Sequence, residues 1–219
     1  TDASICPLID SYGALLTSLR LGGCVLLSDE VLSKVKEICS NLLHLDIGHL
    51  HNLSEAAILS LFIQKQEEES ETSETMMVQD EENGDAEFVN EATRTSSQSV
   101  TLVSAYSHIG SLESINLVNV RNTTDEVIKF LSEACKGLRD VCIGGCKKLT
   151  DKAIICLCAN AKHLLSLDIS FVRGIRNQAM VYMVDSCSDL KTLHVWGCTQ
   201  LDSFYSLHSN HDLLVVGRT

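Results

Sequence analysis

Ten cysteines are the residues of this chain with the clearest capacity for chemistry, and five of them fall between positions 135 and 158. Cysteine thiolates can bind zinc, act as nucleophiles or pair as disulfides. The spacings among Cys142, Cys146, Cys156 and Cys158 differ from those of the usual zinc pairs, and no histidine follows at a ligand spacing. We therefore expect neither a metal site nor a cofactor at these cysteines.

Sequence motifs for catalysis are also missing. There is no glycine-rich phosphate-binding fingerprint and no G-x-S-x-G nucleophile motif. Gly22-Gly23 and Gly144-Gly145 occupy the same position in two copies of a repeat, which indicates a tight strand exit instead of a phosphate cradle. Nothing beside His194 in the pattern could relay charge to it, so we interpret it as a surface histidine. The sequence predicts that the chain is not an enzyme.

The elements that position these residues repeat with a period of about 26 residues. Leu138, Val141 and Ile143 form the pattern L-x-x-L-x-L, which predicts a short strand with alternate side chains buried. Thr150 then opens an apolar run at helical spacing, as a helix N-cap. One strand and one helix cannot bury their own apolar faces, so each unit needs neighbours. The pattern begins at Leu16, Leu42, Leu112, Leu138, Leu164 and Leu190.

The period and the template are those of a leucine-rich repeat. We predict one α/β domain over residues 1–219, a horseshoe-shaped solenoid of about six repeats of about 26 residues. Its parallel sheet lines the concave side and its helices line the convex side. Most cysteines recur at fixed template positions, which predicts buried, reduced thiols, one in each layer. This favours a protein of the nucleus or cytoplasm, with a disulfide framework as the alternative. The two sets are Cys24, Cys146 and Cys198, and Cys39, Cys135 and Cys187.

An acidic insertion at 65–99 interrupts the period after the second repeat. It holds most of the negative charge of a chain whose net charge is −12, so it cannot bury enough apolar surface to offset its ordering entropy. We predict a disordered loop, either without function or regulated by phosphorylation at Ser70, Thr72, Ser73 and Thr75. A third alternative is a loop with short docking anchors at Met76, Met77, Val78, Phe88 and Val89. Whether the sheet stays continuous across the insertion is open. The acidic balance argues against a sequence-independent nucleic-acid binder, and no apolar run is long enough for a membrane span.

The two ends of the array depart from the template. The first ten residues align with the helix at 150–159, so the chain begins inside a repeat, and we expect a longer protein with further chain before Thr1. Pro7 predicts that this first helix is short or broken. Asn177 is the expected N-cap of the fifth helix. Beyond Leu201 we predict a last helical turn at 204–207 and a final strand at 213–216.

The outward positions of the strands form a wall of small and polar side chains. We predict that a protein substrate binds this concave face. Trp196 is the sole tryptophan, and it either packs on the C-terminal segment or anchors a partner. The candidate contact residues are Arg20, His44, Asp46, Asn116, Asp140, Asp168, Phe171, His194 and Trp196.

The unit C-x-x-L-x-x-L-x-L-x-x-C-x-x-L-[TS]-D resembles the cysteine-containing repeats of F-box leucine-rich-repeat proteins, which are substrate receptors of cullin-type ubiquitin ligases. It stands at 135–154 as CKGLRDVCIGGCKKLTDKAI. The ending at 196–217 resembles a Rad-seven-like group of nucleotide excision repair factors. The resemblance implies a substrate-recognition subunit, with a Skp1-like or elongin/cullin partner bound outside this chain, since no F-box is present here. The alternatives are a repair factor and a scaffold or inhibitor unrelated to ubiquitin. No direct binding of nucleic acid or membrane is expected.

Overall fold

The computed structural model describes residues 1–63, 109–201 and 212–217. The acidic insertion at 65–99 and the expected helical turn at 204–207 lie outside the described residues. The elements in chain order are α1 (Asp2–Tyr12), the 3-10 turn η1 (Gly13–Leu15), β1 (Ser18–Arg20), α2 (Asp29–Ile38), β2 (His44–Asp46), α3 (Glu55–Ser60), β3 (Ser114–Asn116), α4 (Asp125–Ala134), β4 (Asp140–Cys142), α5 (Asp151–Asn160), β5 (Ser166–Asp168), α6 (Asn177–Ser186), β6 (Thr192–His194) and β7 (Leu214–Val216).

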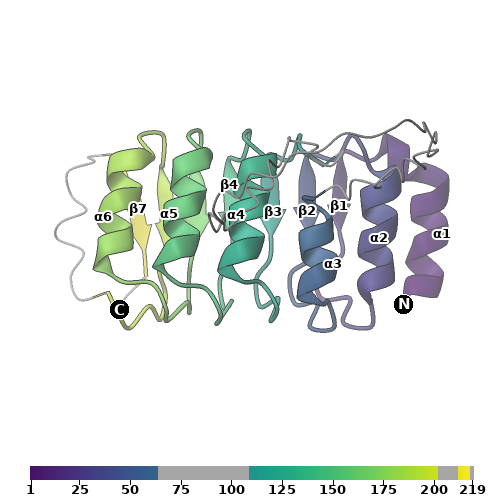
Figure 1. Ribbon diagram of the computed structural model, residues 1–219, viewed down its shortest axis with the longest axis horizontal. Coiled ribbons are helices and arrows are strands. Elements are labelled where there is room, and N and C mark those ends of the chain that lie inside the picture. Colours follow the sequence, from purple (N-terminus) through teal and green to yellow (C-terminus); the bar gives the residue numbers. More distant parts are fainter. Residues whose placement is uncertain (64–108, 202–211, 218–219) are drawn as a thin grey trace, which may run out of the picture. The chain divides into compact units, whose positions relative to one another are not determined.

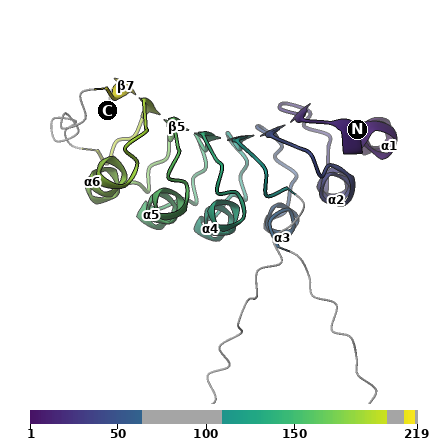
Figure 2. The same ribbon diagram turned by 90° about the horizontal axis from the view of Figure 1, so that it is seen from above.

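The strands form one parallel sheet in chain order, from β1 to β7. The described repeats place this sheet on the inner side and the helices on the outer side (Figures 1 and 2), which confirms the predicted leucine-rich-repeat solenoid. β2 pairs with β3 in full register, His44 opposite Ser114, although the insertion separates them in the sequence. The sheet is therefore continuous across the insertion. The final strand predicted at 213–216 is confirmed as β7.

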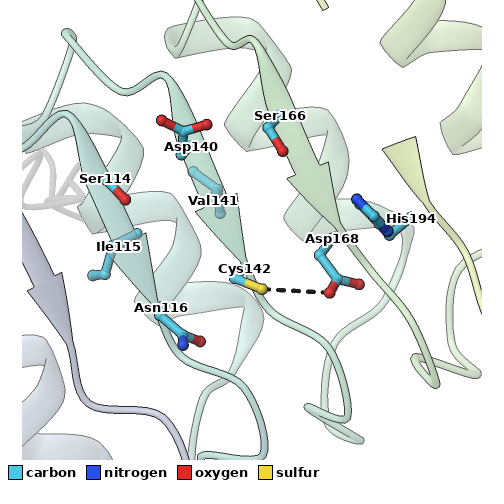
Figure 3. Close-up of a pocket in the computed structure, with 9 residues that line it drawn as sticks. All are labelled: Ser114, Ile115, Asn116, Asp140, Val141, Cys142, Ser166, Asp168 and His194. Carbon is cyan, nitrogen blue, oxygen red and sulfur yellow. Dashed lines mark hydrogen bonds between the residues drawn. The ribbon is translucent and has the colours of Figure 1, made fainter. Parts of the chain in front are cut away.

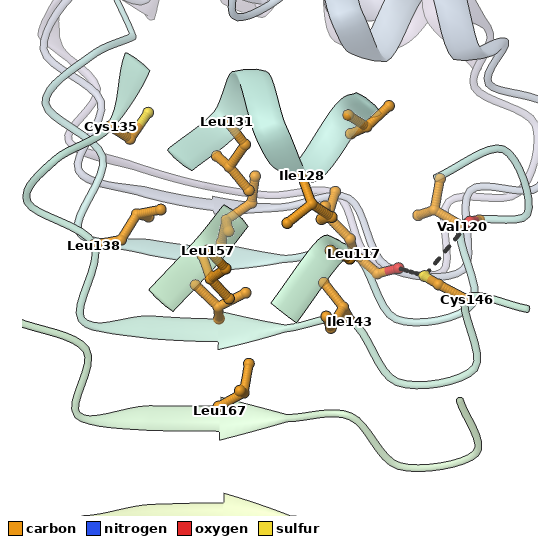
Figure 4. Close-up of a cluster of buried hydrophobic side chains, with 14 of the residues drawn as sticks. Leu117, Val120, Ile128, Leu131, Cys135, Leu138, Ile143, Cys146, Leu157 and Leu167 are labelled. Atoms are coloured by element: carbon orange, nitrogen blue, oxygen red, sulfur yellow. Dashed lines mark hydrogen bonds between the residues drawn. The ribbon is translucent and has the colours of Figure 1, made fainter. Parts of the chain in front are cut away.

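The core lies between the sheet and the helices, and each repeat contributes one layer to it (Figure 4). In the fourth repeat Leu138, Val141, Ile143, Cys146 and Leu149 are all at most 2% exposed. Burial of each such aliphatic side chain contributes about 1.5–3 kcal/mol, and a solenoid layer gains it only against its neighbours. The apolar template thus sets the stacking of the repeats.

Each helix begins next to a carboxylate from the helix before it. Asp125, the first residue of α4, accepts hydrogen bonds from the backbone N–H of Thr150 (2.8 Å) and from its hydroxyl (2.6 Å). Thr150 in turn caps α5 by accepting from the N–H of Lys152. Equivalent carboxylate contacts join Asp2 to Ser28, Asp29 to Ser54, Glu55 to Thr124 and Asp151 to Arg176. These contacts fix the spacing between successive helices.

Two expectations about helices are wrong. The N-cap of α6 is Arg176, without a side-chain capping bond, and Asn177 is the first helical residue. Asn177 occupies the position that carboxylates hold in α2 to α5. Pro7 lies inside an unbroken α1. The proline removes the hydrogen bond to the carbonyl of Ala3, and Pro7 and Ala3 are both exposed, so water can reach this carbonyl.

All ten cysteines are free, and seven of them are buried. The buried thiols of Cys146 and Cys198 donate to backbone carbonyls one layer back, Leu117 and Ile169, each at 3.1 Å. Cys24 holds the same template position but is exposed, which corrects the prediction that this set is buried. It lies in the first strand layer of the described chain, where no preceding strand supplies the carbonyl and the cover.

Candidate functional site

The outward face of the sheet carries a shallow depression over β3 to β6, with a volume of about 220 Å³. Figure 3 shows side chains from neighbouring strands on this face. Two are carboxylates, Asp140 and Asp168, and no lysine or arginine is among the lining residues. The lining is Ser114, Ile115, Asn116, Asp140, Val141, Cys142, Ser166, Asp168 and His194.

The carboxylate of Asp168 has two contacts within the sheet. Its Oδ1 accepts from the backbone N–H of Ser170 at 2.8 Å, and its Oδ2 accepts from the thiol of Cys142 at 3.4 Å. The corresponding side chains of Asp46 and Asn116 accept from the N–H of the residue two positions later, at 2.9 and 3.0 Å. These side chains therefore hold the turn at each strand exit as well as presenting polar atoms to the face.

Cys142 is the thiol at the floor of the depression. Burial raises its pKa to about 12, with the negative charge and hydrogen bond of Asp168 acting in the same direction. A thiol with this pKa is almost entirely protonated at neutral pH, and the thiolate is the nucleophile. Cys142 therefore acts as a hydrogen-bond donor to Asp168.

Two aromatic side chains lie at the strand exits beside the depression. Trp196 follows His194 by two residues and is 47% exposed, and Phe171 is 62% exposed. The two segments are joined by the backbone N–H of Phe171, which donates to the carbonyl of Trp196. The backbone of Trp196 also lies against Gly217, which follows β7. The chain after β7 thus lies against the Trp196 backbone, while Trp196 as a whole is about half exposed. A role of Trp196 as a partner anchor stays a prediction.

Phe171 has a left-handed backbone, with φ of +62°. The same position is glycine in three other repeats, Gly23, Gly145 and Gly197, all with positive φ. These conformations agree with the predicted strand exits at the glycine pairs. For a bulky residue the left-handed region costs about 1–2 kcal/mol. Phe171 holds this conformation with its ring packed over Gly197, where an added Cβ would lie 2.5 Å from the ring.

The structure brings together four of the predicted contact residues. Asn116, Asp140, Asp168 and His194 line the depression. Phe171 and Trp196 lie at its strand-exit side. The three predicted residues of β1 and β2, Arg20, His44 and Asp46, are on the same sheet but do not line it.

Three lining residues are not among the predicted contact residues, although all three occupy outward strand positions. They are Ser114, Cys142 and Ser166. The hydrogen bonds of the Asp46 and Asp168 row were missed too. Gly22 and Gly48, each at the exit of the preceding strand, make room for the side chains of Asp46 and Asn116, so a glycine at the preceding strand exit is the usable signal.

Features for other chemistry are few in the described parts of the chain. Within residues 1–63, 109–201 and 212–217, no three His, Cys, Asp or Glu side chains are grouped as metal ligands would be. None of the described helices is long and apolar enough to cross a bilayer. A second hollow of about 220 Å³ lies on the helical side, against Asp125, Glu126, Lys129, Lys152, Ile155 and Cys156.

The repeats and their sheet define this chain as a leucine-rich-repeat solenoid. No protein-family profile matches the sequence, and no curated protein matches it. Its fold is similar to one in the crystal structure of the Rad7 and Elc1 complex in yeast, with a TM-score of 0.71 and 17% identity, over 99% of this chain and 44% of that chain. At this identity the similarity concerns the fold alone. The chain spans less than half the length of that relative.

Weaker fold similarity extends to two further solved structures. The tropomodulin C-terminal domain of Caenorhabditis elegans has a TM-score of 0.46 and 11% identity, over 96% of this chain and 90% of that one. An internalin of Listeria monocytogenes has a TM-score of 0.42 and 15% identity, over 98% of this chain and 64% of that one.

Proposed function

We propose that this chain is a non-enzymatic protein-recognition module that binds a partner protein on the outward face of its sheet. The observation that carries the proposal is the face itself, a continuous parallel sheet with a polar depression and two exposed aromatic residues, Phe171 and Trp196. Exposed aromatic side chains beside polar groups are typical of binding hot spots. The free cysteines support a location in the nucleus or cytoplasm.

The more specific proposal is a substrate-recognition subunit of a cullin-type ubiquitin ligase. Two observations support it. The cysteine-containing repeats resemble those of F-box leucine-rich-repeat proteins, and the similar solved fold belongs to a complex of Rad7 with Elc1. In this proposal a Skp1-like or elongin/cullin partner binds a region outside this chain, and the sheet presents the substrate for ubiquitin-dependent protein catabolism.

Affinity purification of the tagged full-length protein from its own cells tests the ligase proposal. We expect recovery of a cullin together with a Skp1-like or elongin-type protein. Recovery of other protein partners, without a cullin, a Skp1-like protein or an elongin-type protein, would contradict the ligase proposal and favour a scaffold or inhibitor.

A pair of matched variants tests the binding face. Trp196→Ala is expected to lose the substrate while retaining the cullin-containing partners. The control is Tyr182→Ala, which truncates an exposed aromatic residue of α6 on the helical side, and it should retain both. Equal losses in the two variants would contradict a site on the sheet.

The fold similarity also favours a second candidate, a Rad-seven-like factor of nucleotide excision repair. Deletion of the gene would then make cells sensitive to ultraviolet light. Unchanged survival after irradiation, with a cullin still recovered, would favour the general ligase subunit instead.

A further inference from the structure

The outward sheet face over β3 to β6 is acidic at its centre. Among its outward strand positions, Ser114, Asn116, Asp140, Cys142, Ser166, Asp168, Thr192 and His194, there are two carboxylates and no lysine or arginine. Asp140 is exposed, and Asp168 is half-buried. A cationic group that enters the depression therefore meets carboxylates from two neighbouring strands, whereas an anionic group meets repulsion from both.

The basic residues next to these strands lie outside the depression. Arg139, the residue before β4, lies 3.9 Å from the carboxylate of Glu113, and Lys191 directly precedes β6. Arg20 lies in β1, where it is paired in register with Asp46. The lining of the depression itself therefore holds two carboxylates and no lysine or arginine.

An apolar subsite lies within a short reach of these carboxylates. Asp168 is opposite His194 in the sheet register, and Trp196 lies two residues beyond His194, just past the end of β6. Strand spacing and residue rise place the Cα atoms of Asp168 and Trp196 about 8 Å apart. Side chains two positions apart in an extended segment point to the same side and are separated by about 7 Å. One extended segment can reach both subsites.

Phe171 adds a second exposed aromatic side chain to this subsite. Its backbone is left-handed with φ of +62°, as are those of His49 and Asn119, and three other repeats hold glycine at this position. The residue is 62% exposed, and its ring packs over Gly197, the residue after Trp196. Two exposed aromatic side chains on joined segments favour an aromatic clamp formed by Phe171 and Trp196.

From the charge, the depression and the clamp we propose that the sheet face binds an extended basic-apolar segment of a partner protein. The segment carries a Lys or Arg two residues from a large apolar side chain. The cation lies between Asp140 and Asp168, and the apolar side chain lies against Trp196 and Phe171. This inference rests on the proposed function, because it names the partner chemistry of the same face.

Selection from a random peptide library displayed on phage, with the whole chain 1–219 immobilised, tests the inference. We expect the selected peptides to be enriched in Lys or Arg at two residues from Leu, Ile, Phe, Tyr or Trp, and depleted of Asp and Glu. Binding of a selected peptide should weaken as salt is raised, because the charges are partly exposed. A selection that yields no peptides, or peptides without basic residues, would overturn the proposal.

Matched variants assign the contacts. Asp168→Asn keeps an oxygen for the Ser170 N–H, as Asn116 does for Val118, and should weaken a selected peptide about fivefold. Trp196→Ala should weaken it more than tenfold. Glu126→Gln and Tyr182→Ala, which remove a charge and an aromatic ring from the helical side, should change affinity by less than about twofold.

The outcomes separate this inference from the proposed function. If Trp196→Ala abolishes binding but the selected peptides show no basic preference, the sheet remains the binding face and the basic-segment inference falls. If neither Asp168→Asn nor Trp196→Ala affects binding, both the basic-segment inference and the proposed binding site on the sheet are wrong. The ligase proposal is tested separately by recovery of the cullin.

Discussion

Removal of the Asp125 carboxylate should loosen the junction between α4 and α5. In Asp125→Ala the Thr150 N–H and hydroxyl lose their acceptors at 2.8 and 2.6 Å. Hydrogen bonds to charged groups contribute about 1.5–3 kcal/mol when buried, but Thr150 is exposed and water replaces part of each bond. The carboxylate also favours the N-terminus of α4 by about 0.3–1 kcal/mol. We expect a loss of about 1.5 kcal/mol in the free energy of unfolding.

For a chain of this size such a loss lowers the melting temperature by roughly 3–6 °C. Thermal and urea unfolding, followed by circular dichroism, measure the change. The control is Glu126→Ala, which removes the same charge from the same end of α4 but no hydrogen bond between repeats, and it should cost less than about 0.5 kcal/mol. Equal losses for the two variants would refute the role assigned to the carboxylate, because charge and helix dipole alone would then explain both.

Three further predictions follow from single side chains. The buried hydroxyl of Thr123 meets only the weakly polar thiol of Cys146 among the described residues, so Thr123→Val should raise stability by about 1 kcal/mol in urea unfolding; a loss would show that the thiol contact is worth more. The raised pKa of Cys142, about 12 against 9.0, means that the unfolded chain releases this proton first. Stability should therefore hold below about pH 8 and fall as pH rises from 9 to 12, and Cys142→Ser should reduce the slope of the urea midpoint against pH in that range. Phe171→Gly should raise the melting temperature while weakening peptide binding, because it removes left-handed strain and the exposed ring together; a lower melting temperature would show that packing of the ring over Gly197 dominates.

The apolar period was sufficient to predict the fold because the same apolar positions are buried in every repeat. Leu45 and Ile115 hold the same place in the template, and they are paired in neighbouring strands, although the sequence left the continuity of the sheet across the insertion open. A shift of register by one residue would turn the buried side chains outward. The sequence therefore specifies strand order, register and the inward side of each strand.

The apolar period of the sequence does not predict the polar contacts between neighbouring repeats. The contact of Asp125 with Thr150 depends on the distance between adjacent helices, which no local pattern contains. The template can also predict a contact that is absent. The position of Cys24 predicts burial, but Cys24 lies in the first described layer and is exposed. Neighbours in space, not residue type, decide both cases.

The candidate site could be predicted as a face but not as a depression. Alternation along the strands identifies Asp140, Asp168 and His194 as outward residues, whereas the hollow arises from the small side chains Ser114 and Ser166 beside them. Similarly, the left-handed conformation of Phe171 follows from its alignment with glycines, although its exposure depends on the course of the chain after β6.

Asn116 and Asp168 occupy the same position in two repeats, and they differ in charge but make the same kind of hydrogen bond. Both side chains hold their strand exits through one oxygen that accepts a backbone N–H, at 3.0 and 2.8 Å. An amide oxygen therefore meets the structural requirement, and a negative charge adds nothing to the turn that an asparagine lacks. The charge of Asp168 also raises the pKa of Cys142 and is partly desolvated, which disfavours the isolated face. The second carboxylate oxygen accepts from the thiol of Cys142 at 3.4 Å, a contact that the amide nitrogen of an asparagine cannot accept. Asp168→Asn therefore keeps the turn contact and removes the charge that the proposed cation would meet.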